Sequence, residues 1–405
     1  MRSQRITFPN AAGQQLSARL EQPVNQHAHT YALFAHCFTC NKNLTAVRNI
    51  SRALTQAGVA VLRFDFTGLG DSEGDFVDTN FTSNVEDLVA AAQWLAEHHE
   101  GPRILIGHSL GGAAVLCAAG VIPTAAAVAT IGAPFDPTHV AHLFGDSLER
   151  IEKEGRATVT IGGRSFDIDQ QFIDDLEANR VDAHIKDMRK PLLVMHSPQD
   201  RTVEIENARL IYDAAHHPKS FVTLDGADHL LTNKADSLYA GELIATWSKR
   251  YINLPEKEKL KADKQVAVRL GKEGFTTDIA ARQHTLTADE PEKVGGNDFG
   301  PTPYELVAAG LGACTAMTMQ MYARRKGWVI DEVRVQLHHF KDYADDMAAT
   351  LDEKPKKMDH FERVITLEGE LDEGQRTRLL EIADRCPVHR TLHEEVVVRT
   401  TLTPV

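Results

Sequence analysis

The stretch RILIGHSLGGAAVLCAA, residues 103–119, places the pentapeptide GHSLG (107–111) between two apolar runs. The first run is short and uninterrupted, as in a strand that is buried on both faces, and the second reads as a helix. In this context the G-x-S-x-G pattern forms a tight turn that exposes its serine, because the glycines permit a strained backbone. We therefore predict that Ser109 is a nucleophile; a tight turn with a capping serine is the alternative.

A nucleophilic serine needs a base, and the base needs a carboxylate that orients it. Asp200 and His229 each follow an apolar run, which places them at the carboxyl ends of strands, where parallel sheets bind ligands. We predict a triad of Ser109, Asp200 and His229. Asp225 and Asp228 are rival acids, but both are too close to His229 in sequence to lie on a neighbouring strand end. A helix-capping role for Asp200 is the other alternative.

Short apolar runs alternate with helical stretches up to about residue 250, for example YALFAHC (31–37), GVAVLRFDF (58–66) and PLLVMHS (191–197). This alternation predicts an α/β domain with a parallel sheet over residues 1–253. The opening residues instead read as a hairpin that turns at Asn10–Gly13. Residues from about 135 to 190 are acidic and mixed, which predicts a small cap inserted between strands.

The segment LPEKEKLKADK (254–264) is charged and begins near a proline, so residues 254–263 are expected to form a linker. Residues 264–405 then show a different order. Alternating strands precede a long helix that begins near Thr302 and Pro303, and two strands, a helix and a final strand over 394–403 follow. This order predicts a second domain of the α+β class.

The chain has 405 residues, more than one hydrophobic core usually covers, so two domains are expected. A net charge of −13 argues against a nucleic-acid partner. No apolar run approaches the roughly 18–20 residues of a membrane helix, and no signal peptide is visible. We therefore expect a soluble, cytoplasmic protein with no membrane partner. Five cysteines without an export signal argue against structural disulfides, and no motif implies an organic cofactor or a metal.

The GHSLG turn, together with the strand that runs into GLGDSEG (68–74), resembles the α/β-hydrolase superfamily of serine esterases and peptidases. The resemblance covers residues 1 to about 250 and implies hydrolysis of a small-molecule acyl substrate. In that family the loop after the third strand donates one oxyanion N–H group, and the residue after the serine donates the other. The resemblance implies that the donors here are the amides of Phe38 (or Cys37) and Leu110. Cys37 stands where the family usually has glycine.

Two cysteines lie in the second domain. Cys314 follows Gly310 and Gly312 in an apolar helical pattern, and a helix break at these glycines would place it in the first turn of a new helix, where a thiolate is stabilised. A buried structural cysteine is the alternative. Cys386 follows at the end of a later helix. A zinc site formed by Cys314, Cys386 and His389 is a further alternative, although four-ligand spacing is missing.

The helix PYELVAAGLGAC (303–314) and the turn CPV (386–388) resemble the family of osmotically induced protein C and organic hydroperoxide resistance proteins (OsmC/Ohr), over roughly residues 263–405. The resemblance implies that Cys314 reduces an organic hydroperoxide and that Cys386 resolves the product as a disulfide, which a thiol reductant then reopens. It also implies an intertwined homodimer, and Glu305 as a possible supporting residue. The alternative is a second domain that only dimerises or binds an apolar ligand.

Cys37 and Cys40 lie in the predicted oxyanion loop, just before a helix expected to begin near Asn43. Residues three apart in a tight turn can reach the Cα separation of about 4.4–6.8 Å that a disulfide requires. Oxidation of this pair would reorient the local amides, so we hypothesise a redox switch of the hydrolase. The alternative is that two small side chains simply fit a crowded loop.

Overall fold

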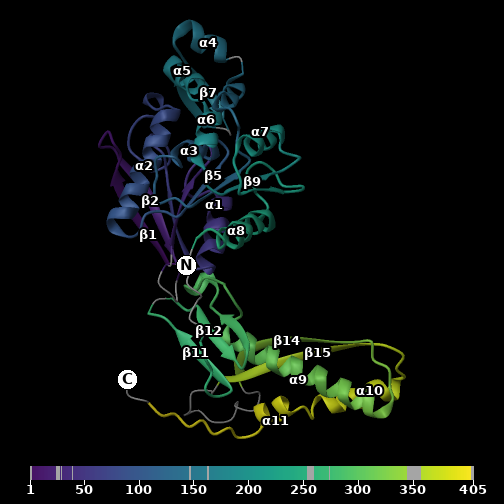
Figure 1. The fold of residues 1–405 in the computed structure, drawn as a ribbon. Coiled ribbons are helices and arrows are strands. Elements are labelled where there is room, and N and C mark those ends of the chain that lie inside the picture. Colours follow the sequence, from purple (N-terminus) through teal and green to yellow (C-terminus); the bar gives the residue numbers. More distant parts are fainter. Residues whose placement is uncertain are drawn as a thin grey trace. The chain divides into compact units, whose positions relative to one another are not determined.

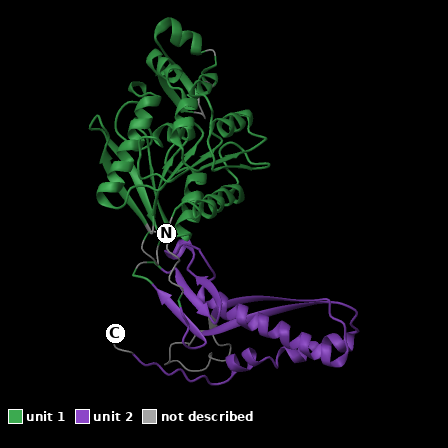
Figure 2. Cartoon of the chain, in the orientation of Figure 1, with its two compact units in different colours: residues 1–260, 271–274 green, residues 261–270, 275–405 purple. Residues whose placement is uncertain are grey.

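The computed structural model describes residues 2–23, 28, 30–38, 40–145, 147–161, 164–252, 260–272, 274–343 and 357–402. The chain divides into two compact units, residues 1–260 with 271–274 and residues 261–270 with 275–405 (Figure 2). The predicted linker 254–263 lies mostly outside the described residues. The predicted fold class is confirmed: the first unit has a mixed central sheet of the α/β-hydrolase type, and the second combines helices with small sheets.

The first unit is built on an eight-stranded sheet with the order β1-β2-β4-β3-β5-β6-β9-β10 (Figure 1). The predicted hairpin β1–β2 forms the antiparallel edge and pairs with β4, whereas the remaining strands run parallel. Because parallel strands end at the same edge, the loops after β3, β5, β9 and β10 gather there. The strands are β1 (Arg2–Pro9), β2 (Gln15–Gln22), β3 (Thr30–Ala35), β4 (Val59–Phe64), β5 (Ile104–His108), β6 (Ala127–Ile131), β9 (Leu192–His196) and β10 (Lys219–Thr223).

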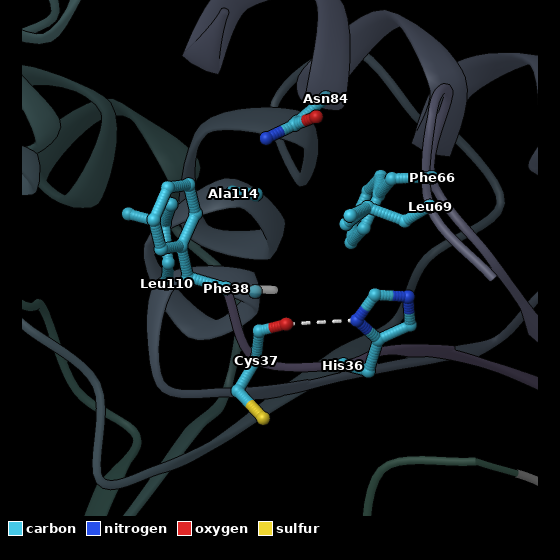
Figure 3. A pocket seen from close by; sticks show the side chains of 9 residues that line it. His36, Cys37, Phe38, Phe66, Leu69, Asn84, Leu110 and Ala114 are labelled. Carbon is cyan, nitrogen blue, oxygen red and sulfur yellow. Dashed lines mark hydrogen bonds between the residues drawn. The ribbon is translucent and has the colours of Figure 1, made fainter. Parts of the chain in front are cut away.

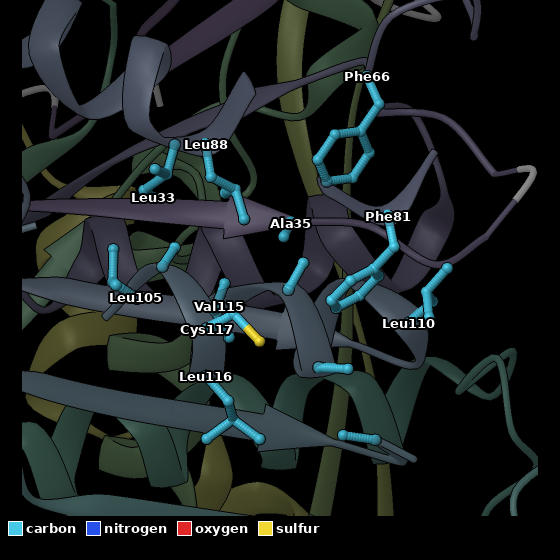
Figure 4. Close-up of a cluster of buried hydrophobic side chains, with 14 of the residues drawn as sticks. Leu33, Ala35, Phe66, Phe81, Leu88, Leu105, Leu110, Val115, Leu116 and Cys117 are labelled. Atoms are coloured by element: carbon cyan, nitrogen blue, oxygen red, sulfur yellow. The ribbon is translucent and has the colours of Figure 1, made fainter. Parts of the chain in front are cut away.

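Helices cover both faces of this sheet, which explains why its central strands read as uninterrupted apolar runs. Helices α1 (Thr45–Gln56) and α8 (Lys234–Ser248) pack together on one face, and α2 (Phe81–His98) and α3 (Leu110–Ala118) pack on the other. Helix α7 (Glu206–Ala214) follows β9. The helix expected near Asn43 begins at Thr45. Figure 4 shows the side chains of α3, including Leu116 and Cys117, inside the apolar core beside Leu33 and Leu105.

Between β6 and β9 the chain forms the small insertion that the mixed composition of residues 135–190 led us to expect. It is a mixture of short helices and one hairpin. Its elements are η2 (Pro137–Phe144), α4 (Ser147–Glu154), β7 (Arg156–Ile161), β8 (Arg164–Asp169), α5 (Gln170–Ala178) and α6 (Val181–Met188). The short helix η1 (Phe76–Asp78), which follows β4, packs against β8 of this insertion.

The second unit holds a three-stranded antiparallel sheet, a two-stranded ribbon and helices. The predicted final strand over 394–403 is wrong for the single chain: residues 394–402 form no strand. Strands need a partner strand for their backbone N–H and C=O groups, and among the described residues none pairs with this segment. The elements are β11 (Val266–Leu270), β12 (Thr277–Ala281), β13 (His284–Ala288), η3 (Glu292–Val294), α9 (Pro303–Lys326), β14 (Glu332–Tyr343), β15 (Lys357–Glu368), α10 (Glu373–Ala383) and α11 (Pro387–His393).

Helix α9 runs without interruption from Pro303 to Lys326, so the helix break expected at Gly310 and Gly312 is wrong. A capping box between Thr302 and Glu305 begins the helix, and the continuous hydrogen bonding that follows outweighs the weak helix propensity of glycine. By length and composition α9 could cross a membrane, which corrects the expectation that no segment is long and apolar enough. A helix that packs inside a protein passes the same test.

Candidate active site

Ser109 lies at the turn between β5 and α3 with φ 55° and ψ −127°, a backbone conformation that side-chain-bearing residues rarely adopt. Its N–H donates to the carbonyl of Ile131 on β6 at 2.9 Å, which ties the turn to the neighbouring strand. A Cβ at Gly107 would overlap the carbonyl oxygen of Gly111, and a Cβ at Gly111 would overlap that of His36. Both glycines are thus required by close backbone approaches.

The three residues predicted as a triad come together in the structure. The Nε2 atom of His229 lies 2.9 Å from Oγ of Ser109, and its Nδ1 atom lies 2.7 Å from Oδ2 of Asp200. Ser109 and Asp200 are buried, and the imidazole of His229 is 11% exposed. A base that contacts a hydroxyl on one side and a carboxylate on the other can remove a proton and be stabilised when it carries the charge.

The carboxylate of Asp200 is held by its own loop. Oδ1 accepts from the amides of Thr202 and Val203 at 2.8 and 3.0 Å, which leaves Oδ2 for His229. Burial alone would raise the pKa of Asp200, but the hydrogen bonds and the charge of His229 outweigh it and lower the pKa below its usual value. Asp200 therefore stays ionised. Gly132, which the sequence did not single out, lies beside this pair: its Cβ would be 3.3 Å from Oδ2 of Asp200.

The predicted oxyanion loop follows β3 and contains a disulfide between Cys37 and Cys40, whose Cα atoms are 5.3 Å apart. The expectation that the cysteines form no disulfide is therefore wrong for this pair. The carbonyl of Cys37 accepts two hydrogen bonds, from the amide of Cys40 at 3.1 Å and from Nδ1 of His36 at 2.8 Å. These contacts close a tight turn around Phe38.

A cavity of about 10 Å³, large enough for roughly one water molecule, lies between this loop and the serine turn. It is lined by His36, Cys37 and Phe38 from the loop and by Leu110 and Gly111 from the start of α3 (Figure 3). Among the described residues, the amides of Phe38 and Leu110 donate to no backbone carbonyl. Phe38 and Leu110, whose amides are the predicted oxyanion donors, thus both line this cavity, and their role as donors stays a prediction.

The side chain of Phe38 joins an aromatic cluster that continues into the insertion between β6 and β9. Its ring lies 5.6 Å from those of Phe76 and Phe172 and 6.4 Å from that of Phe144, and Phe76 lies 5.1 Å from Phe166. Phe38 therefore carries a predicted oxyanion donor on its backbone and an apolar contact with the insertion on its side chain.

Two further buried histidines surround the triad, and the sequence did not single them out. His108 donates from Nε2 to the carbonyl of His229 at 2.6 Å, and its ring lies 5.2 Å from that of His229. His196 donates from Nε2 to the carbonyl of Val203 at 2.8 Å. Burial is the main cause that lowers the pKa of both, to about 3 for His108, where the nearby His229 adds to the effect. Both rings are therefore neutral at pH 7. In the sequence, the only signal for these two histidines is their position directly at the end of an apolar run.

In the second unit, Cys314 lies in the middle of α9 and is partly buried, not at a helix N-terminus. Cys386 is fully buried at the start of α11, where its Sγ accepts from the amide of His389 at 3.3 Å. Sγ also lies 3.7 Å from Oγ1 of Thr315, the residue that follows Cys314. Cys386 thus contacts the residue that follows Cys314 in α9, and both cysteines are free thiols.

An arginine that the sequence did not identify reaches the same place. Arg363 on β15 donates from Nη1 to Oγ1 of Thr315 at 2.8 Å and to the carbonyl of Ala383 at 3.2 Å, and it pairs with Asp384 at 2.6 Å. It lies far from both cysteines in sequence, so only the fold reveals it. Cys117, by contrast, lies in the core of the first unit, where burial raises its pKa to about 12.

Glu305 is engaged at the start of α9, where its carboxylate accepts from the amide of Thr302 at 2.7 Å. A capping role accounts for it. Within the described residues, no group of three or more His, Cys, Asp and Glu side chains is arranged to hold a metal ion.

Two family models match the chain. One, described as "Alpha/beta hydrolase family", matches residues 32–240, and the other, described as "OsmC-like protein", matches residues 295–401. Among solved structures, the esterase domain of a Rhodothermus marinus protein is 52% identical to this chain, with a TM-score of 0.53 over 62% of this chain and 99% of that one.

Among curated proteins, two relatives are similar to about half of the chain at lower identity. The lysophosphatidylserine lipase ABHD12 of Danio rerio is 27% identical over 207 residues, which is 48% of this chain and 50% of that protein. The mitochondrial palmitoyl-protein thioesterase ABHD10 of Mus musculus is 26% identical over 212 residues, which is 50% of this chain and 70% of that protein. The matched region therefore covers 50% of the length of the lipase and 70% of the length of the thioesterase.

Proposed function

Since the chain belongs to the alpha/beta hydrolase family and carries an OsmC-like domain after it, we propose that it is a serine hydrolase that cleaves carboxylic esters or thioesters. The observation that carries the proposal is the pair of contacts made by His229, to Ser109 at 2.9 Å and to Asp200 at 2.7 Å. The similar proteins include an esterase domain, a lipase and a palmitoyl-protein thioesterase, which supports ester or thioester bonds as the substrate class.

In the proposed mechanism, His229 takes the proton of Ser109 as its Oγ attacks the acyl carbonyl carbon. The imidazolium is stabilised by Asp200, which the amides of its own loop keep ionised. The amides of Phe38 and Leu110 stabilise the negative oxygen. His229 then protonates the leaving alcohol or thiol, and water, activated by the same base, releases the acid from the acyl-enzyme.

The direct test is a panel of p-nitrophenyl esters and acyl thioesters of increasing chain length, with labelling by a fluorophosphonate serine-hydrolase probe. We expect hydrolysis by the native protein and loss of both hydrolysis and labelling in Ser109→Ala. Cys117→Ser is a matched control, because this thiol is buried in the core away from the turn. Full activity in Ser109→Ala would exclude the proposed triad.

For the second unit we propose thiol-dependent reduction of organic hydroperoxides by Cys314 and Cys386. The thiolate of Cys314 attacks the outer peroxide oxygen and forms a sulfenic acid, while the alcohol leaves. Cys386 then condenses with the sulfenic acid, which forms a disulfide and releases water, and an external dithiol reduces that disulfide. The support for this proposal is Thr315, which follows Cys314 in α9. Its hydroxyl contacts Cys386 and accepts a hydrogen bond from Arg363.

The alternative is that this unit only dimerises or binds an apolar ligand. Thiol titration before and after one equivalent of cumene hydroperoxide distinguishes the two. Peroxidase chemistry consumes two thiols for each peroxide, and this loss is absent from the Cys314→Ser/Cys386→Ser variant. An unchanged thiol count in the native protein supports the alternative.

We further propose that the chain forms a homodimer through its second unit. Helix α9 leaves Met317 and Met321 65% and 63% exposed on one face, and Val397 and Val398 of the irregular C-terminal segment are 74% and 82% exposed. Exposed apolar side chains on a helix and on an irregular segment favour a protein interface. A second copy would supply partners for both.

A further inference from the structure

Three of the buried histidines of the first unit occupy equivalent places. His36 follows β3, His108 ends β5 and His196 ends β9, so each imidazole lies at the carboxyl end of a central parallel strand. Their exposed fractions are 1%, 2% and 1%. None of them is a member of the proposed triad, and a buried imidazole is costly unless its N–H group is satisfied.

Each of the three makes the same kind of contact. His36 reaches the carbonyl of Cys37 at 2.8 Å, as the dashed line in Figure 3 marks, His108 that of His229 at 2.6 Å and His196 that of Val203 at 2.8 Å. A carbonyl oxygen only accepts, so the contacting ring nitrogen carries the hydrogen: Nδ1 in His36 and Nε2 in the other two. Among the described residues, the second ring nitrogen of each has no hydrogen-bond partner.

The three carbonyls belong to the three loops that the proposed chemistry needs. That of Cys37 lies in the oxyanion loop, that of His229 belongs to the base itself, and that of Val203 lies in the loop whose amides hold Asp200. On this basis, and resting on the proposed hydrolase function, we propose that His36, His108 and His196 are positioning residues. Each donates one hydrogen bond that sets the backbone of one functional loop.

For His36, the hydrogen bond acts directly on the peptide group that carries the predicted oxyanion donor. The Cys37 carbonyl and the Phe38 N–H belong to one planar peptide group, in which the two bonds point in opposite directions. The hydrogen bond from Nδ1 therefore aims the N–H of Phe38 away from the imidazole. The amide of Cys40 donates to the same oxygen at 3.1 Å and supports this orientation. An oxyanion donor that is already oriented costs no rearrangement during the reaction.

His108 acts on the base in the same way. It contacts the backbone of His229 and packs against its ring at 5.2 Å, so it restrains the residue that must reach Ser109 and Asp200 together. His196 fixes the carbonyl of Val203 while the amide of that residue donates to Asp200 at 3.0 Å. A small misplacement of such groups lowers the rate without loss of binding.

The test uses the difference in donor position. An asparagine amide nitrogen replaces Nδ1, whereas a glutamine amide nitrogen reaches about as far as Nε2. His36→Asn, His108→Gln and His196→Gln are therefore matched, and His36→Gln, His108→Asn and His196→Asn are mismatched. Because the matched residue is the smaller one at position 36 and the larger one at the other two, a size effect cannot imitate the pattern.

We expect each mismatched variant to lose about tenfold or more in kcat for p-nitrophenyl acetate, with KM within about twofold, and each matched variant to keep most of kcat. Thermal unfolding of all six shows whether a loss reflects unfolding. Equal kcat in matched and mismatched variants would overturn the proposal.

Hydrogen exchange measured by mass spectrometry provides a readout that does not need activity. Each mismatched variant is expected to speed amide exchange in its own loop, residues 36–42, 200–204 or 226–232, and not in the other two. A native protein that cleaves no ester or thioester would refute the proposed function, whereas exchange that is the same in matched and mismatched variants would refute the positioning role.

Discussion

Ser109 is the one residue of the proposed triad in a strained backbone conformation, with φ 55° and ψ −127°. The strain persists because its neighbours pack too closely for any relaxed turn: Gly107 and Gly111 have no room for a Cβ against backbone oxygens. A backbone obstacle cannot rotate away, unlike the end of a flexible side chain. The cost of a substitution at these glycines is therefore steric.

Gly111→Ala should abolish ester hydrolysis and lower the melting temperature by several degrees, because the new methyl group meets the carbonyl of His36. Gly120→Ala is the matched control, since its Cβ meets nothing within 4 Å. Calorimetry and p-nitrophenyl acetate hydrolysis measure the two effects. Equal melting temperatures for the two variants would contradict the steric argument.

The buried histidines make stability depend on pH. Burial lowers the folded-state pKa of His108 to about 3, against an ordinary value of 6.5, and it also lowers that of His36 and His196. The unfolded chain therefore binds more protons between these values. Stability is fully present above about pH 6.5 and is lost as the pH falls toward 3.

For His108 alone the loss by pH 4.5 is about 3 kcal/mol, which corresponds to a fall in melting temperature of roughly 5–10 °C. Thermal unfolding from pH 7.5 to 4.5 measures it. His108→Gln carries no titrating group and should flatten this dependence. An identical slope in this variant would show that other groups cause the acid lability.

At the level of elements, the loop between β3 and α1 is anchored at both sides of its disulfide. His36 holds the carbonyl of Cys37, and beyond Cys40 the ammonium of Lys42 is buried against Asp65 and contacts Asp71 at 2.8 Å. A change of redox state at Cys37 and Cys40 is therefore confined to the turn that carries the Phe38 amide.

A dithiol reduces this disulfide to two thiols and itself becomes a cyclic disulfide. Because the turn then loses one of its restraints, reduction should change the esterase kcat by several-fold or more. The Cys314→Ser/Cys386→Ser background isolates the effect from the second unit. Cys37→Ser/Cys40→Ser should have the rate of the reduced protein under all conditions. If mass spectrometry follows the 37–40 disulfide opening and the rate stays constant, the switch hypothesis is wrong.

For the whole molecule, the two units hold chemically separate candidate sites. The first contains a serine, a histidine and a carboxylate, and the second contains two cysteines, of which Cys386 contacts the Thr315 hydroxyl that Arg363 binds. Ser109→Ala should leave cumene hydroperoxide consumption unchanged, and Cys314→Ser should leave ester hydrolysis unchanged. Both assays on both variants test this, and loss of both activities in either one would show that the sites depend on each other.

The proposed dimer is also a property of the whole molecule. Met317→Lys/Met321→Lys on α9 should convert the full-length protein to a monomer at micromolar concentration, because two charges would be buried at the interface. Val121→Lys, at an equally exposed apolar residue of the first unit, is the control. Light scattering measures both, and a native protein that is already monomeric would refute the proposal.

The sequence by itself determined both folds and the three residues of the proposed triad. Uninterrupted apolar runs identify strands buried on both faces, and a serine between glycines, with Asp200 and His229 after later runs, places all three at one sheet edge. These signals are local, so the sequence alone contains them.

The tertiary structure alone decided the rest. His108 and Arg363 contact residues far away in the chain, and His196 contacts Val203 across a loop whose conformation only the structure shows, so no sequence spacing reveals these contacts. The uninterrupted α9 and the absence of a strand over residues 394–402 were likewise decided by the structure, since continuous hydrogen bonding outweighs the weak helix propensity of glycine and a strand requires a partner.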